Sequence, residues 1–353
     1  MTTARPHPPK IELHVHLEGT VRPALLAAIA RAHGMAPPVP PDQPYAFTDL
    51  YDFIATWNAL TACLRTPEDY RRILLAYAAE AAGQGAVYLE PIVDAEERLG
   101  GPSGWADVLA ACCDAAAEAR ERHGVAVGLT PQVFRGQDVA FAEEAARIAT
   151  RFTGRGVVGF GLAGAEGRFP TAPYARAARI AADGGLPFVP HAGEAAGPAA
   201  VREVLAMGAA RVRHGVRAVE DPELVAELAG RGTVLDVTPT SNLRLGVAAP
   251  DRPHPLTVLD AAGVHCSVST DDPAIFGITL AGEYAVAARL GVGPAEAYAA
   301  GLAGALCDAP TRRWLADVGV RAYGSGPRAR ASAVTTAAGP RSPALNPDNL
   351  DQG

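Results

Sequence analysis

Short apolar runs rich in β-forming residues alternate with longer alanine-rich stretches along most of the chain, and this alternation limits the fold most strongly. The expected strands are residues 11–17, 87–92, 125–133, 157–162, 187–191, 211–214, 234–238 and 265–270. Stretches between them, such as 106–124 and 222–232, are amphipathic and end on a glycine suited to a helix C-cap. Strands separated by helices predict parallel βαβ units. Eight such units over about 260 residues match a (β/α)8 TIM barrel of the α/β class.

A doubly wound sheet is the alternative, but it usually carries a glycine-rich phosphate loop after its first strand. Here the first strand runs into HVHLEG. Residues 20–85 are too long for one connection, so we expect extra helices between strands 1 and 2, including 48–62 and 67–82, and further helices at the C-terminus. We expect a single folded domain over residues 9–321. Small residues and proline dominate residues 322–353, which predicts a disordered tail.

The composition excludes several classes of function. The 353 residues include 38 acidic and 31 basic side chains, with no basic run, so neither nucleic acid nor an anionic membrane is an expected partner. Five cysteines without a C-x-x-C pair predict neither a disulfide framework nor a cysteine zinc site. No apolar stretch approaches the roughly 20 residues of a membrane helix. The N-terminal MTTARPHPPK lacks the apolar core of a signal peptide, and we expect a cytoplasmic protein.

Four histidines fall at the C-terminal ends of expected strands. His14 and His16 are two residues apart in the first strand, so their side chains emerge on the same face. His191 ends the fifth strand and His214 the sixth. In a barrel these strand ends meet around one mouth, where active sites form. The histidines are therefore candidate zinc ligands, and the alternative is that each is satisfied by hydrogen bonds in the core.

Acidic residues and glycines follow the same strand ends. Asp271 and Asp272 come after the eighth strand, where they are either helix caps before proline or groups acting on a metal and its water. Glu194 is either a helix-start carboxylate or a general acid held protonated by burial. Gly161 and Gly164 are either turn residues or positions that let a backbone N–H approach a flat ligand.

These motifs lie within four longer segments, which are PKIELHVHLEGTVRP, VPHAGE, RVRHGVRAVEDPEL and STDDPAIFG. In this order, from about residue 9 to residue 318, they resemble the adenosine deaminase family of the metal-dependent hydrolases. The resemblance implies one zinc ion, held by His14, His16, His191 and Asp271. Some related hydrolases bind two metals through a carboxylated lysine on a middle strand. The chain has a single lysine, Lys10, which excludes that design.

The resemblance also implies a reaction and a role for each remaining residue. Hydroxide derived from the zinc water attacks C6 of a purine, and the products are the 6-oxo purine and ammonia. Glu194 would protonate ring atom N1, and His214 would orient and help deprotonate the water. Asp272 would hydrogen-bond that water and the base, and the Gly164 N–H would meet N3. His16 and Glu18 would contact the substrate, with Glu18 near its sugar.

The substrate itself remains open at this point. Leu50, Phe53, Ile54 and Trp57 form an apolar helical stripe, which is either core or, as in the family, a lid over the purine. Glu18 replaces an aspartate of animal-type members, and segments such as VYLEPIVDAEER resemble actinobacterial members assigned to 6-aminodeoxyfutalosine. We therefore expect a small purine nucleoside, either adenosine or 6-aminodeoxyfutalosine. Free adenine, a non-purine ring, and a catalytically silent purine-binding relative are the alternatives.

Overall fold

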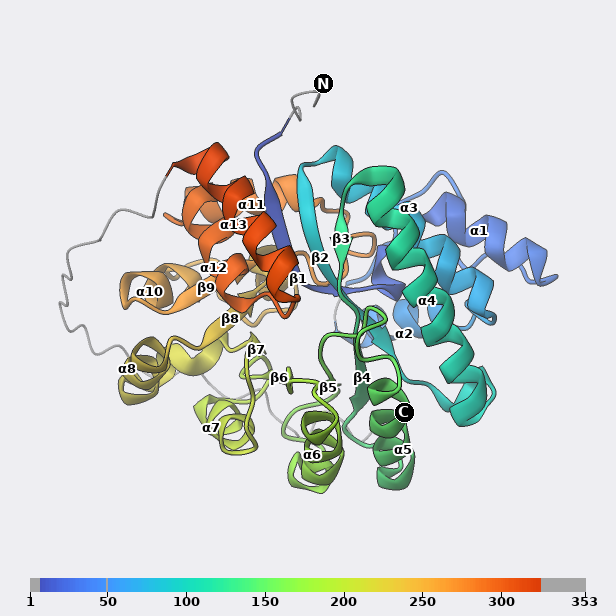
Figure 1. Cartoon of the computed structure of the whole chain (residues 1–353), viewed down its shortest axis with the longest axis horizontal. Coiled ribbons are helices and arrows are strands. Elements are labelled where there is room, and N and C mark those ends of the chain that lie inside the picture. Colours follow the sequence, from blue (N-terminus) through green and yellow to red (C-terminus); the bar gives the residue numbers. More distant parts are fainter. Residues whose placement is uncertain (1–6, 49, 325–353) are drawn as a thin grey trace.

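The computed structural model describes residues 7–48 and 50–324, with the backbone alone at 50 and 51. Parallel strands form its centre and helices surround them (Figure 1). The strands are β1 (Lys10–His16), β2 (Ala86–Asp94), β3 (Ala126–Val127), β4 (Thr130–Phe134), β5 (Gly161–Ala163), β6 (His191–Ala192), β7 (Val212–His214), β8 (Val234–Val237) and β9 (His265–Val268). The arrangement confirms the predicted (β/α)8 barrel.

The barrel wall consists of two parallel sheets. One has the order β1-β2-β4-β5, with β3 paired to β2, and the other has the order β6-β7-β8-β9. Single bridges join the two sheets, at Val15 with Asp271 on one side and at Phe160 with Phe188 on the other. The wall is therefore closed by much sparser pairing at these two seams than within either sheet.

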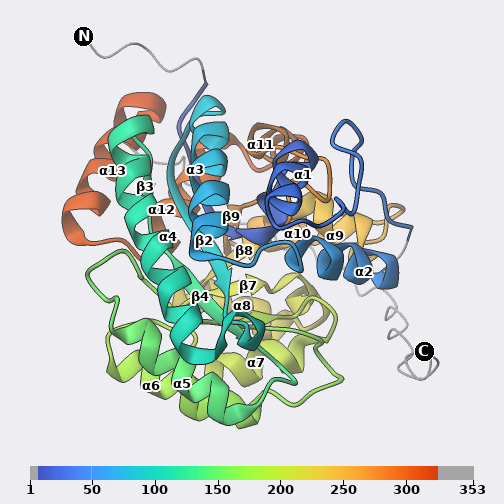
Figure 2. The same cartoon turned by 90° about the vertical axis from the view of Figure 1, so that its right-hand side faces the viewer.

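Helices cover the outside of the barrel. They are α1 (Pro23–Ala32), α2 (Leu50–Thr61), α3 (Pro67–Gly83), α4 (Gly101–His123), α5 (Val139–Thr150), α6 (Ala175–Asp183), α7 (Pro198–Ala206), α8 (Pro222–Arg231), α9 (Pro239–Arg244), α10 (Pro255–Ala261), α11 (Leu280–Arg289), α12 (Pro294–Gly304) and α13 (Ala309–Tyr323). The predicted insertion between the first two strands contains α1, α2 and α3, and Figure 2 shows α1 and α2 on the same side of the barrel. Gly124 and Gly232 end α4 and α8 in the left-handed conformation, as predicted.

Three predicted strands differ from the observed ones. The predicted strand 125–133 is divided, because its pairing with β2 is interrupted at Leu129, whose N–H donates to Gly156 O at 2.7 Å, and resumes only at Thr130. The predicted strands 157–162 and 187–191 are reduced to β5 and β6. Pro187 and Pro190 lie within the predicted strand 187–191 and lack the N–H groups that a longer ladder requires.

The C-terminal boundary also differs slightly from the prediction. Helix α13 continues to Tyr323, whose hydroxyl donates to Pro9 O at 2.7 Å, so residues 322 and 323 are helical. The remainder of the predicted tail, 325–353, lies outside the described residues. Within the described part of the chain, no helix is both long enough and apolar enough to cross a membrane.

Candidate metal and catalytic site

Three histidines and one aspartate meet at the mouth of the barrel. His14 and His16 come from the end of β1, His191 begins β6, and Asp271 follows β9. The Nε2 atom of His191 lies 3.1 Å from His14 Nε2 and 3.2 Å from His16 Nε2. Asp271 Oδ1 lies 3.2 Å from His14 Nε2. One ligand atom from each residue lies within 4.8 Å of the others, so these four side chains could hold one metal ion.

The chemistry of these donors fits a metal ion. Burial lowers the pKa of His14 and His191 and lowers that of His16 to about 3, so all three imidazoles are neutral and have a lone pair to offer. Burial alone would raise the pKa of Asp271, but the surrounding histidines outweigh it and keep the carboxylate ionised. Three nitrogens and one oxygen at a single point are a ligand set typical of zinc.

Two residues of the site have backbone conformations that side chains rarely adopt. His214 has φ 61° and Asp271 has φ 66°, in the left-handed region that favours glycine. Asp271 is fixed there because its N–H donates to His14 O at 3.1 Å and its carbonyl accepts from His16 N–H at 2.8 Å. Its Oδ2 accepts from Ser241 Oγ at 2.7 Å, which leaves Oδ1 to face the histidines. Such strain is retained where the surroundings over-determine the backbone, commonly at functional sites.

Glu194 and His214 form a second cluster beside the metal ligands. Their side chains approach to 3.4 Å between Glu194 Oε2 and His214 Nε2. Burial, followed by the charge of Asp271, raises the pKa of Glu194 well above its usual value, which favours the protonated form of this carboxyl group. Burial lowers the pKa of His214, which is therefore neutral. The pair thus offers one proton donor and one proton acceptor at the same place.

Asp272 and Glu18 are two further buried carboxyl groups of the predicted site. Asp272 Oδ1 has no hydrogen-bond partner among the described residues, and a Cβ atom on Gly19 would lie 2.0 Å from it. Glycine is thus required after Glu18. The Glu18 side chain is 0% exposed, and its Oε1 accepts from Asp94 N–H at 3.1 Å. Burial raises the pKa of Glu18 to about 7. Its predicted contact with substrate stays a prediction.

The predicted lid lies over this mouth. The ring of Trp57 on α2 stands perpendicular to that of His16, with centroids 5.6 Å apart, and Phe53 stacks on Phe276 at 5.4 Å. Ile54 is 45% exposed, so the predicted stripe does not face inward at that position. The side chain of Leu50 lies outside the described part of the structure.

Gly164 directly follows β5 and is exposed. The approach of a flat ligand to its N–H stays a prediction. The φ of Gly164 is +92°, and a Cβ atom there would lie 3.0 Å from the backbone nitrogen of Arg135. Both features require glycine. Gly161 is buried in β5 instead, where a Cβ atom would meet Arg213 Nη1 at 2.5 Å, so its role is packing.

Several polar residues that contact the site were not predicted from the sequence. Ser241 binds Asp271, as described above. Gln132 places its Nε2 atom 3.4 Å from His16 Nδ1 and donates to Asp94 Oδ1 at 2.8 Å. The position of Gln132 on the inner face of an expected strand is the one signal that could have identified it. Ser241 lies on α9, beyond any strand end, and carries no such signal.

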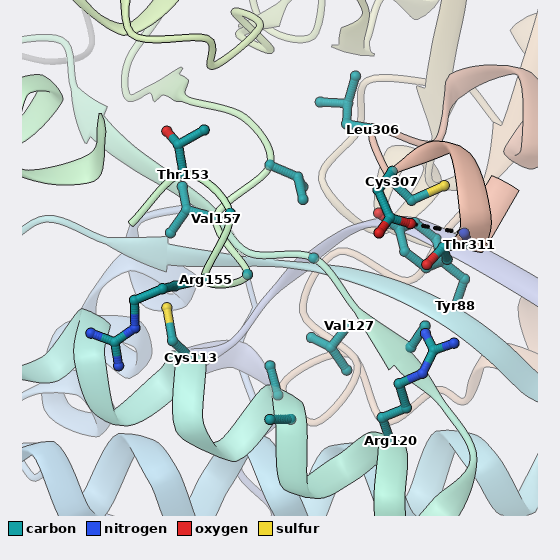
Figure 3. A pocket seen from close by; sticks show the side chains of 18 of the residues that line it. Tyr88, Cys113, Arg120, Val127, Thr153, Arg155, Val157, Leu306, Cys307 and Thr311 are labelled. Atoms are coloured by element: carbon teal, nitrogen blue, oxygen red, sulfur yellow. Dashed lines mark hydrogen bonds between the residues drawn. The ribbon is translucent and has the colours of Figure 1, made fainter. Parts of the chain in front are cut away.

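A separate cavity of about 470 Å³ lies where the strands begin, away from these residues (Figure 3). Tyr88, Val127, Val157 and Leu306 contribute much of its apolar lining. Cys113 also lines it, and burial raises the pKa of that thiol to about 12, which makes it a poor nucleophile. The chemistry-bearing side chains are therefore concentrated at the other end of the barrel.

Comparison with known proteins agrees with this geometry. The model of the adenosine deaminase family matches residues 9–320. The aminodeoxyfutalosine deaminase of Acidothermus cellulolyticus is 46% identical, over 94% of this chain and 96% of that protein. The adenine deaminase of Rhizobium johnstonii is 40% identical, over 82% of this chain and 91% of that protein.

Solved structures share the fold. The adenine deaminase of Arthrobacter aurescens superposes with a TM-score of 0.79 at 28% identity, covering 89% of this chain and 98% of its own. An amidohydrolase from Burkholderia ambifaria with bound zinc superposes with a TM-score of 0.74 at 26% identity, covering 89% of this chain and 93% of its own. The resemblance inferred from the four sequence segments is confirmed. The chain belongs to the adenosine deaminase family and is a hydrolytic deaminase that acts on a C–N bond.

Proposed function

We propose that the protein is a zinc-dependent deaminase that converts the 6-amino group of an adenine nucleoside to a 6-oxo group and releases ammonia. One observation carries this proposal: three imidazole nitrogens and Asp271 Oδ1 converge beside Glu194, a carboxyl group whose pKa is raised. His14, His16, His191 and Asp271 would hold the zinc ion. When bound, zinc supplies a water molecule whose pKa is lowered to about 7, and thus a nucleophile at neutral pH.

The proton transfers belong to Glu194 and His214. The protonated carboxyl of Glu194 donates to ring nitrogen N1, which removes the negative charge that develops on the ring as C6 is attacked. His214 takes a proton at Nε2 if its Nδ1 carries the other hydrogen. Thr238 Oγ1 lies 3.3 Å from that Nδ1 and, as a hydroxyl oxygen, can accept this hydrogen, so the contact is compatible with the required tautomer.

Binding and exclusion of water belong to the surrounding residues. The unpartnered Oδ1 of Asp272 is available to the base and the attacking water, and Gly164, an exposed residue, would offer its backbone N–H to N3. Trp57 and Phe53 on α2 cover the mouth with apolar rings. A closed apolar cover strengthens the electrostatic interactions inside the site and excludes bulk water.

We favour 6-aminodeoxyfutalosine over adenosine as the substrate. The support is the relative of that name, which is 46% identical over nearly the whole chain. Free adenine is the second candidate, supported by the adenine deaminases at 38–40% identity over about four fifths of the chain.

A substrate panel tests the proposal. Ammonia release by zinc-loaded protein from aminodeoxyfutalosine, adenosine, deoxyadenosine and adenine should be compared by kcat/KM. We expect aminodeoxyfutalosine to rank first. A higher kcat/KM for adenine would contradict the assignment of a nucleoside substrate. Adenine has no sugar, so such a result would show that contacts beyond the ring do not contribute to catalysis. Tight binding of these compounds without ammonia release would identify a catalytically silent relative and contradict the proposal.

A further inference from the structure

Arg135 directly follows β4 and bonds to residues of the site, but it takes no part in the proposed chemistry. It is 4% exposed, and its guanidinium contacts two strand ends. Nη2 donates to His191 O at 2.7 Å, and Nη1 donates to Gly164 O at 3.4 Å. Nε donates to Thr171 Oγ1 at 3.0 Å. One side chain thus holds the backbone of a metal ligand and the backbone of the glycine that would contact N3.

Glu166 makes the complementary connection. It lies two residues after Gly164, in the loop that follows β5. Its Oε2 accepts from Glu194 N–H at 3.2 Å and from Ala196 N–H at 2.7 Å, in the loop that follows β6. The loop that carries Gly164 is therefore bonded directly to the loop that carries Glu194.

These contacts lie at a weak point of the barrel wall. Strands β5 and β6 belong to different sheets, and in the described chain a single bridge, Phe160 with Phe188, joins their segments. Ladder hydrogen bonds therefore do little to fix the distance between the two strand ends. The side chains of Arg135 and Glu166 bond across this seam where the backbone pairing is sparse.

We infer that Arg135 and Glu166 are positioning residues that fix the Gly164 N–H and the Glu194 carboxyl at one separation across the β5–β6 seam. This inference rests on the proposed function, in which those two groups contact N3 and N1 of one rigid ring. Because the ring is rigid, the Gly164–N3 and Glu194–N1 contacts can form at the same time only when the two loops are at one particular distance. A displacement of about 1 Å at such a site lowers the rate by about 100-fold.

Substitutions at both residues test this inference, with kcat and KM measured for the best substrate of the panel. In Glu166→Ala and Arg135→Gln we expect kcat to fall about 10- to 100-fold, because the groups are displaced in the transition state. We expect KM to change less than about threefold and the zinc content to be unchanged. Glu166→Gln keeps an oxygen that can accept from both N–H groups, so it should restore most of the activity.

Matched substitutions on the surface are the controls. Arg155 and Glu68 have side chains 55% and 63% exposed and lie away from the site. Arg155→Gln and Glu68→Gln should leave kcat and KM as in the wild type. Equal losses of kcat in these controls, or a loss in Glu166→Gln as large as in Glu166→Ala, would overturn the inference.

Hydrogen exchange provides a readout that does not depend on turnover. In zinc-loaded wild type, the amides of Glu194 and Ala196 should exchange slowly, and in Glu166→Ala about tenfold faster or more. Unchanged exchange together with unchanged kcat in Glu166→Ala would overturn the inference, even if Arg135→Gln fails to fold. A wild type that releases no ammonia but shows the expected exchange would overturn the proposed function and, with it, the role of the two residues in placing purine contacts. The bonds across the seam would still be established by that result.

Discussion

Two buried polar regions of the barrel differ in how completely their groups are partnered. Inside the barrel, Arg211 is 1% exposed and donates to Asp236 Oδ2 at 2.6 Å and to Glu90 Oε2 at 2.7 Å. The second oxygen of each carboxylate also accepts a hydrogen bond. At the mouth, in contrast, Asp272 Oδ1 and His191 Nδ1 have no partner among the described residues.

The difference separates groups that support the fold from groups kept for chemistry. Where every charge is paired, removing one member leaves the others buried and alone, so the loss appears as stability. At the mouth, the unpartnered atoms of Asp272 and His191 and the strained backbone of His214 and Asp271 already reduce the stability of the fold. Substitutions at the mouth should therefore change zinc binding or turnover and leave the fold largely intact.

The largest expected effect is on turnover. Glu194→Gln keeps the size of the side chain but removes its transferable proton, so kcat/KM should fall by about 100- to 10,000-fold. Steady-state ammonia release measures this, with zinc per chain and thermal unfolding as controls that should match the wild type. Near-normal activity would show that Glu194 is not the acid.

The next effect is on stability. Arg211→Met leaves Glu90 and Asp236 buried without their cation, and we expect the free energy of unfolding to fall by about 3–5 kcal/mol. Urea unfolding measures it, and Arg155→Met on the surface is the matched control. A loss below about 1 kcal/mol, as for a surface pair, would contradict the comparison between the two regions.

Metal content provides a third test. Asp271→Ala removes the single oxygen ligand, and we expect zinc affinity to fall by about tenfold or more. The free energy of unfolding of the metal-free protein should also fall, because the substitution removes the acceptor of Ser241 Oγ and a carboxylate whose lowered pKa stabilises the fold. Zinc content after dialysis against a weak chelator measures the effect. Full retention of zinc would exclude Asp271 from the ligand set.

The smallest effect concerns Asp69, a buried carboxylate on α3, outside the barrel. Its Oδ2 atom hydrogen-bonds to His33 and to the backbone N–H groups of Arg65 and Thr66. Burial would raise its pKa, but the N–H groups of Arg65 and Thr66, with His33, outweigh this and lower it. A lowered pKa means that Asp69 stabilises the fold above about pH 3.9, the usual value, and that this contribution is lost as the pH falls through the folded pKa.

We therefore expect Asp69→Asn to reduce the free energy of unfolding by about 1–2 kcal/mol at pH 7. The difference from wild type should shrink below about pH 4. Urea unfolding at several pH values measures it. A difference that grows as the pH falls would contradict the sign of the pKa shift.

Sequence reasoning reached the residues whose position follows from strand geometry. His14 and His16 share a face because they are two residues apart in a strand. His191 and His214 lie in neighbouring strands of one barrel, so the meeting of the four histidines could be predicted. The division of the predicted strand 125–133 could not, because it depends on which neighbour Leu129 pairs with.

The unpredicted residues depend on loop conformation. Glu166 reaches the loop after β6 because of the turn that follows β5, and no periodic pattern in the sequence encodes that turn. Arg135 follows the expected strand 125–133, and nothing in the sequence around it indicates that it is buried. The left-handed backbone of Asp271, which aims Oδ1 at the histidines, is set by bonds to β1 that form only in the closed barrel.

The central claim is that one zinc ion, held by the three histidines and Asp271, supports deamination. It is tested most directly by titrating zinc into metal-free protein while measuring the rate of ammonia release from the best adenine nucleoside. We predict no release without metal, a linear rise with added zinc, and a plateau at one zinc per chain. A plateau at two, or full activity in the chelated protein, would contradict the account.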